Sequence, residues 1–221
     1  PVFEKTDRYI RLLEELDLKL VKVVDTHVHA DHITAMGALR DRTNCVTVMG
    51  EQSPVDVVSM RVSDGERVTI EGIDLTAMHT PGHTDDSYCF RMDDRVFTGD
   101  TLLIRGTGRT DFQNGDAGQQ YDSLFDGVLK LPESTLVYPA HDYKGDMVST
   151  IGEERANNPR LQVGSRDEYI ELMAGLNLPN PKMMDVAVPE NIRMGLNLER
   201  QREVATVTPE SIIMDNAEGM L

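Results

Sequence analysis

Positive charge is scarce in this sequence of 221 residues. Its 22 Lys and Arg are outnumbered by 38 Asp and Glu, which leaves a formal net charge of −16 at pH 7. A chain of this charge repels phosphate polyanions and anionic lipid head groups, so we expect neither nucleic acid nor a membrane as a partner. Long hydrophobic runs are also missing, since none approaches the ~20 residues that a membrane-spanning helix needs. No signal or transit peptide is recognisable at the start.

Cysteine is nearly absent as well. Only Cys45 and Cys89 occur, and no pair of cysteines has the spacing of a metal or redox motif. Two lone cysteines in a chain of this length are typical of a reducing compartment rather than of a disulfide-bonded secreted protein. We therefore expect the cytoplasm of a bacterium, or the mitochondrial matrix if the source is eukaryotic. Both cysteines fall in predicted strands, where we expect them to be buried.

Short strands alternate with helices over most of the chain. The composition, 39% hydrophobic and 27% charged, is that of an ordinary globular protein. Hydrophobic patterns and β-branched runs predict strands at 19–24, 45–49, 67–70, 74–80, 88–92, 95–99 and 135–140. Helical spacing predicts helices from about 33 to 43 and over 7–16, 119–131 and 166–176. The fold class indicated is α/β, with a core of strands and helices outside it.

The end of the chain has a different character. Residues 177–221 hold four of the ten prolines and show little periodicity. We therefore assign residues 1–176 to one layered domain. The remaining residues, 177–221, are expected to form a short helical C-terminal extension that packs on the domain or leads towards another domain.

The histidines carry the clearest chemical signal. His27, His29, Asp31 and His32 lie within six residues, directly after a predicted strand. In extended backbone His27 and His29 point the same way, whereas Asp31 and His32 follow where the chain turns towards a helix. Neutral imidazole and carboxylate are ligands that a divalent first-row metal prefers. This cluster therefore predicts a metal site at a strand–helix junction.

Three more candidate ligands follow other predicted strands. His83 lies in TPGHT, Asp100 ends FTGD, and His141 ends YPAH. Open α/β proteins build their sites where several such loops converge at one edge of a sheet. We therefore expect these residues to join the first cluster in one metal site, and we expect His79 to be structural.

This series of ligands resembles that of the metallo-β-lactamase superfamily, and the resemblance covers about residues 1–197. Several stretches are more similar to the persulfide dioxygenases within that superfamily. RTDFQ (109–113) and HDYKG (141–145) are the most specific of them, because the general superfamily motifs lack both. The others are THVHADHITAMGAL (26–39), TGDTLLIRGTGRTDFQNGD (98–116), YPAHDYKG (138–145), EERANNPRL (153–161) and LNLPNPKMMDVAVPENIRMG (176–195).

The resemblance implies an αββα metallo-β-lactamase-like sandwich with a metal at one edge. It implies one Fe(II) per chain, held by His27, His83 and Asp100, a facial triad that leaves positions open for oxygen and substrate. It further implies an enzyme that oxidises glutathione persulfide with O2 to sulfite and glutathione, in hydrogen sulfide detoxification. The remaining polar residues would support the ligands or mark a second-metal position: His29, Asp31, His32 and His141.

An acidic protein that binds an anionic thiol needs local positive charge. Arg105 and Arg109 lie in a glycine-rich loop just after Asp100, and either guanidinium could bind a carboxylate in bidentate fashion. Arg109, within RTDFQ, is the stronger candidate, and a structural pair with an aspartate of the same loop is its alternative. Tyr143 either donates a hydrogen bond near the persulfide or simply packs.

Two other functions fit parts of the same pattern. A dinuclear thioester hydrolase of the glyoxalase II type would use all seven metal-site residues to activate a bridging hydroxide. A non-catalytic metal- or partner-binding module descended from an enzyme is the second alternative, and the intact triad disfavours it.

The family pattern also raises expectations about the ends of the chain and its partners. Family members begin with a strand hairpin ahead of the segment that matches Pro1–Val2, so we expect the natural protein to be longer at its N-terminus. Some relatives are fused to a sulfurtransferase, so the tail 199–221 could connect to a rhodanese-like domain or partner. A homodimer is expected.

Overall fold

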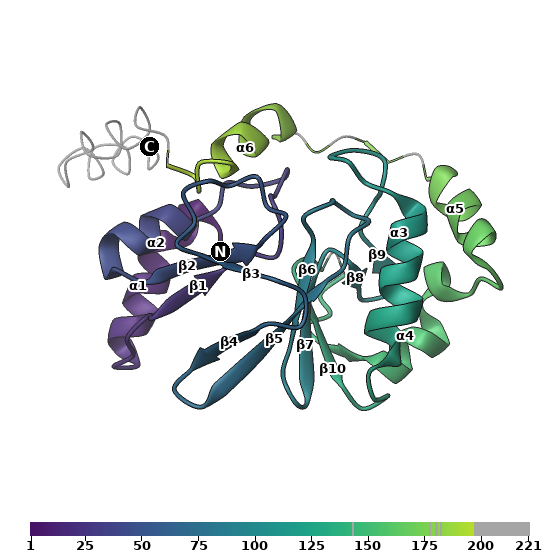
Figure 1. The fold of residues 1–221 in the computed structure, drawn as a ribbon, viewed down its shortest axis with the longest axis horizontal. Coiled ribbons are helices and arrows are strands. Elements are labelled where there is room, and N and C mark those ends of the chain that lie inside the picture. Colours follow the sequence, from purple (N-terminus) through teal and green to yellow (C-terminus); the bar gives the residue numbers. More distant parts are fainter. Residues whose placement is uncertain (143, 177, 180, 182, 197–221) are drawn as a thin grey trace, which may run out of the picture.

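Two β-sheets stacked face to face form the centre of the molecule, and helices cover both outer faces (Figure 1). The computed structural model of the chain describes residues 1–142, 144–176, 178–179, 181 and 183–196. The αββα sandwich expected from the sequence is confirmed. No helix in the described part of the chain is long and apolar enough to cross a membrane.

The smaller sheet has three parallel strands in the order β1-β2-β3. Their bounds are Lys22–Val24, Val46–Gly50 and Met60–Val62. Its helices lie on one side of the molecule in Figure 1: α1 (Thr6–Glu15), α2 (Met36–Thr43) and α6 (Met184–Asn191). Asn44 ends α2 in the left-handed conformation (φ 56°), which asparagine tolerates better than most residues.

The larger sheet has six strands in the order β11-β10-β7-β6-β5-β4. In chain order they are β4 (Arg67–Ile70), β5 (Ile73–His79), β6 (Tyr88–Arg91), β7 (Arg95–Gly99), β10 (Leu136–Pro139) and β11 (Ser149–Thr150). Its outer face is covered by α3 (Ala117–Asp122), α4 (Ile151–Asn157) and α5 (Arg166–Ala174). A short hairpin, β8 (Leu102–Leu103) and β9 (Gly106–Thr107), follows β7.

Three clusters of buried side chains fill the spaces between these layers. Between the sheets lie Val48, Val62, Val68, Ala77, Tyr88 and Phe90. The second cluster joins the larger sheet to its helices, and the third joins the smaller sheet to α1, α2 and α6. Both cysteines are buried as expected, Cys89 in the second cluster and Cys45 in the third. Burial raises the pKa of the Cys89 thiol to about 11.

The strand directions bring four loops to one edge of the sandwich. β7 and β10 are parallel neighbours, and β5 runs in the same direction as β7 because both are antiparallel to β6. The loops that follow β5, β7 and β10 therefore meet at the same edge. The loop after β1 joins them, with the Thr26 carbonyl accepting a hydrogen bond from the Tyr88 amide at 2.9 Å.

Candidate metal centre

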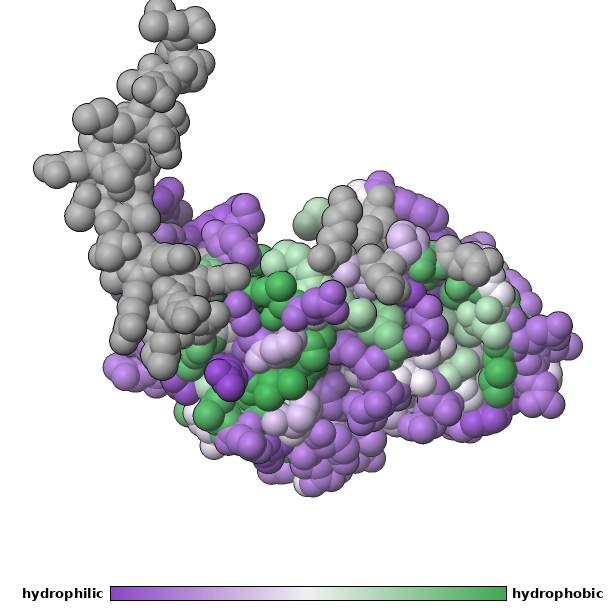
Figure 2. Space-filling model, turned by 90° about the horizontal axis from the view of Figure 1, so that it is seen from above, coloured by the Kyte–Doolittle hydropathy of each residue, from purple (hydrophilic) through white to green (hydrophobic). Residues whose placement is uncertain are grey.

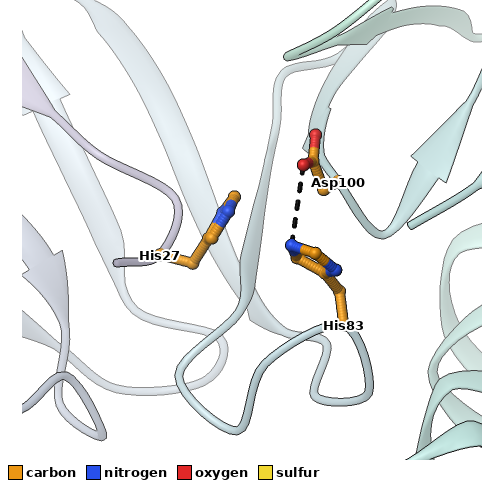
Figure 3. Close-up of side chains that lie close together, drawn as sticks. All are labelled: His27, His83 and Asp100. Atoms are coloured by element: carbon orange, nitrogen blue, oxygen red, sulfur yellow. Dashed lines mark ion pairs between the residues drawn. The ribbon is translucent and has the colours of Figure 1, made fainter. Parts of the chain in front are cut away.

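The convergent loops place the predicted ligands side by side. The imidazole centroids of His27 and His83 are 4.9 Å apart, and Nε2 of His83 lies 3.6 Å from a carboxylate oxygen of Asp100. One donor atom from each residue lies within 4.8 Å of the others. Figure 3 shows the three side chains, each from a different loop, pointing into one space. His27 and His83 are buried, so bulk water has little access to their imidazole nitrogens.

Backbone and hydroxyl groups fix the orientation of both imidazoles. Nδ1 of His83 donates to the Arg109 carbonyl at 2.7 Å. Because a carbonyl can only accept, this bond assigns the proton to Nδ1 and leaves the lone pair of Nε2 facing Asp100. Nδ1 of His27 lies 2.9 Å from the Thr26 hydroxyl, which leaves its Nε2 for the shared space. Two imidazole nitrogens and one carboxylate fit a divalent first-row metal.

Burial, reinforced by the neighbouring imidazoles of His29 and His83, holds the pKa of His27 well below its usual value. The ring is therefore neutral at physiological pH, as a metal ligand must be. At Asp100, burial by itself would raise the pKa, but a hydrogen bond from His141 and the nearby imidazoles outweigh it and lower the pKa. The carboxyl group is therefore ionised.

A second group of candidate ligands adjoins the first. Donor atoms of His29, Asp31 and His32 also lie within 4.8 Å of one another. Nδ1 of His29 is buried and has no hydrogen-bond partner. His141 bridges the two groups, since its Nδ1 lies 2.7 Å from Asp100 and its Nε2 lies 2.8 Å from Asp31.

These two hydrogen bonds raise the pKa of His141 to about 10. At Asp31 burial opposes ionisation, but the hydrogen bonds from His141 and His32 prevail and lower the pKa.

All seven predicted residues lie at one edge of the sandwich, since His141 contacts a member of each group. Which of them touch a metal stays a prediction.

RTDFQ builds one wall of this centre. The Arg109 carbonyl orients His83, while its guanidinium makes a bidentate pair with Asp111, with both bonds at 2.6 Å. The same guanidinium donates to the carbonyls of Pro179 and Leu178. The pairing considered as an alternative from the sequence is thus present, with Asp111 as the partner.

The last two residues of RTDFQ reach the neighbouring loops. The Phe112 ring lies under the Arg109 guanidinium, 4.7 Å from it, and meets the His83 ring edge-on at 6.1 Å. Gln113 donates from Nε2 to the Val28 carbonyl at 3.0 Å, in the loop that carries His27. The RTDFQ segment therefore connects the His83 loop to the His27 loop.

A cavity of about 630 Å³ opens beside the metal centre. His83, Asp100, His141 and Asp31 of the metal centre line it. The lining also includes four cationic residues, Arg105, Arg109, Lys144 and Arg160, and apolar ones such as Leu103, Ile104 and Pro179. Seen from above, patches of hydrophobic residues lie among hydrophilic ones on this face of the molecule (Figure 2).

The predicted substrate residues occupy different positions around this cavity. Arg105 lines it, but its guanidinium is paired with Glu153 and Glu154 of α4. Arg109 lines it as well and is paired with Asp111. Tyr143 lies outside the described residues. His79, expected to be structural, places Nε2 3.0 Å from the Asp85 carbonyl, and its ring contacts the Tyr88 ring at a tilt.

Gly108 offers a direct test of how tightly this centre is packed. A Cβ at this position would lie 2.2 Å from the Asp100 carbonyl oxygen and 2.8 Å from the His83 ring. We expect Gly108→Ala to push the two ligands apart and to weaken metal binding about 10- to 100-fold, the range seen when groups that orient ligands are lost. Competition titration with Co(II) against a chelator measures the change.

Gly106→Ala, two residues earlier in β9, is the matched control. The atom nearest to a Cβ there is a side-chain carbon of Leu103 at 3.9 Å, an ordinary contact. The control should bind Co(II) as the wild type does. Equal affinity in both variants would show that the space around Gly108 does not govern the ligands.

Comparison with known proteins identifies relatives that share the fold described above. Residues 49–141 match the family described as the metallo-beta-lactamase superfamily. The mitochondrial persulfide dioxygenase ETHE1 of Homo sapiens is 44% identical over 199 residues, which cover 89% of this chain and 78% of that protein. The crystal structure of ETHE1 from Myxococcus xanthus superposes with a TM-score of 0.87 at 52% identity, covering 89% of this chain and 87% of that one. Glyoxylase B2 of Dictyostelium discoideum is more distant, at 29% identity over 86% of this chain and 75% of that protein.

Proposed function

Because the chain belongs to the persulfide dioxygenases of the metallo-β-lactamase superfamily, we propose that it oxidises glutathione persulfide at one iron(II) ion held by His27, His83 and Asp100. The observation that carries the iron proposal is the convergence of one carboxylate and two imidazoles whose Nε2 atoms are left for a metal. In the overall reaction the S–S bond of the persulfide breaks. The terminal sulfur takes two oxygens from O2 and one from water and leaves as sulfite, and glutathione is released.

The chain's own part in this reaction is to hold and to orient. Iron(II), when bound, supplies the redox chemistry with O2. Thr26 and the Arg109 carbonyl keep both imidazoles turned towards the ligand space. His141 donates to Asp100 and so restrains the carboxylate from the other side.

The cavity supports a peptide thiol as the substrate. Its volume of about 630 Å³ is within the roughly 300–1,000 Å³ of small-molecule sites. We infer that Arg109 and Arg105 bind the substrate carboxylates. Their guanidiniums are paired with Asp111 and with Glu153 and Glu154, so a glutathione carboxylate would have to exchange with one of these carboxylates. Tyr143 completes this proposal as a hydrogen-bond donor near the persulfide.

We also propose a setting for the enzyme. A reducing compartment, the bacterial cytoplasm or the mitochondrial matrix, agrees with two buried, unpaired cysteines. A homodimer and a sulfurtransferase partner or fused domain follow from the family resemblance. The assignment of 177–221 as a C-terminal extension rests on its prolines and weak periodicity. Analytical ultracentrifugation of the purified chain measures the oligomeric state.

A dinuclear thioester hydrolase is the second candidate. The observation that favours it is the second group of donors, His29, Asp31 and His32, beside the first. Such an enzyme would hold two metal ions per chain and would cleave a glutathione thioester without consuming O2.

Oxygen consumption separates the two candidates. With iron-loaded protein and glutathione persulfide we expect O2 uptake, sulfite as the product and one iron per chain by metal analysis. Zinc-loaded protein is the control and should consume no O2, because Zn(II) has no redox chemistry. Absence of O2 uptake by iron-loaded protein would contradict the proposal, and thioester cleavage with two metals per chain would support the hydrolase.

A further inference from the structure

Helix α6 places a buried polar side chain against the loop of the metal centre. Asn191, the last residue of α6, is 3% exposed and 159 residues distant in sequence from His32. Its Nδ2 donates to the carbonyls of His29 and His32, both at 2.8 Å. Its Oδ1 accepts from the Thr34 amide at 2.9 Å. One carboxamide therefore satisfies three backbone groups of a single loop.

This loop, residues 27–34, has no regular secondary structure of its own apart from one isolated bridge at Thr34, so contacts with other segments must define its path. Its first part is held from the larger sheet's side, where Asp86 accepts from the Val28 amide and Gln113 donates to the Val28 carbonyl. Asn191 holds the second part, which carries His29, Asp31 and His32. The loop is thus fixed from both sides of the sandwich.

The turn that follows α6 fits the same surface closely. Gly195 has φ +68°, and a Cβ there would lie 2.2 Å from the Thr34 carbonyl oxygen. The Met194 carbonyl accepts from the Gly37 amide at 3.1 Å, at the start of α2. The close approach therefore leaves no room for a side chain at Gly195, and these contacts hold the chain directly after Asn191 against the loop.

We propose that Asn191 is a positioning residue for the metal centre. By tying the carbonyls of His29 and His32 to α6, it keeps the side chains of the loop turned towards the ligand space. The inference rests on the proposed function only in taking His27 and its neighbours as the metal site. The C-terminal segment, rather than the layered domain alone, then determines how tightly metal binds.

Asn191→Asp is the sharpest test, because it keeps the size and the acceptor but removes both donors. We expect its dissociation constant for Co(II) to rise about 10- to 100-fold, as when other groups that orient ligands are lost. Hydrogen exchange in the metal-free protein should become faster in the peptide covering 29–33 and should stay unchanged in β10. Should this variant not fold, Asn191→Ser replaces it, since a hydroxyl retains one donor.

Val188→Ala is the matched control. Val188 lies one turn earlier on α6 and packs against the cluster between the smaller sheet and its helices. It should lower the thermal midpoint while leaving the Co(II) dissociation constant unchanged. Wild-type Co(II) affinity in the Asn191 variant, or an equal loss in Val188→Ala, would overturn the proposal. A wild-type chain that binds Co(II) but does not oxidise persulfide would contradict the proposed function and leave this inference standing.

Discussion

His83→Ala abolishes iron binding and O2 uptake, while His79→Ala preserves both: this is the result expected from the geometry of the centre. His83 contributes the donor nitrogen that faces Asp100 at 3.6 Å, and the Arg109 carbonyl fixes its ring. Alanine removes the donor and leaves a buried carbonyl without its partner. Loss of a ligand should exceed the roughly 100-fold effect of losing a group that only orients one.

His79→Ala is a matched control because it lies only four residues away, at the end of β5. Its Nε2 lies 3.0 Å from the Asp85 carbonyl and its ring contacts the Tyr88 ring, and both partners are outside the ligand set. Iron content per chain and the rate of O2 uptake with glutathione persulfide are measured for both variants. Persistent iron binding in His83→Ala, or loss of iron in both variants, would show that the triad is assigned wrongly.

Most strands could be predicted from the sequence, because each is a β-branched or apolar run bounded by turn residues. β4 and β7 have the predicted bounds, and β5, β6 and β10 differ from them by a few residues at most. The short strands β3, β8, β9 and β11 were not predicted, because two or three residues show no periodicity. They form because the folded chain brings a pairing strand beside each of them.

The ends of helices were harder to predict where the helical geometry is irregular. The helix predicted over 119–131 is α3 followed by a π-helical segment, Ser123–Gly127, and a 3₁₀ turn, Val128–Lys130. Helix α6 carries Pro189, which removes a backbone donor and weakens any helical signal. Its stability comes from packing on the smaller sheet's helices, which a local pattern does not reveal.

The seven predicted metal-site residues could be found because each follows a strand, and strand ends meet at one edge. The groups that orient them could not. Arg109 acts on His83 through its carbonyl, and a carbonyl is present in every residue, so no side-chain pattern marks it. Asn191 is distant in sequence from the loop it holds, and the resemblance of 176–195 to the family was its only signal.

Glu154→Ala should cause the largest loss of stability among these variants. Glu154 in α4 is fully buried, and its carboxylate accepts hydrogen bonds from the Arg105 backbone amide at 2.8 Å, the Ser149 hydroxyl at 2.6 Å and Nδ2 of Asn158 at 2.9 Å. It also pairs with the Arg105 guanidinium. These bonds tie α4 to the β8–β9 hairpin that lines the cavity. Removing one partner of a fully buried ion pair costs about 3–5 kcal/mol, and here the remaining partner, Arg105, is 26% exposed.

The lower end of that range is expected, because Glu153 still neutralises Arg105 after the substitution. A loss of about 3 kcal/mol corresponds to a thermal midpoint roughly 6–12 °C lower for a chain of this size. Calorimetry and urea denaturation of the metal-free protein measure it, so that metal binding does not mask the change.

Glu153→Ala is the adjacent control with the same arginine as its partner. The Glu153 side chain is 45% exposed, against 0% for Glu154, and exposed pairs contribute only about 0–1 kcal/mol. Its thermal midpoint should therefore stay close to that of the wild type. Equal midpoints in the two variants would mean that burial of Glu154 contributes nothing to stability. A selective loss in Glu154→Ala would instead establish that a buried carboxylate in α4 anchors the cavity wall, and that Arg105 is held by the fold before any substrate reaches it.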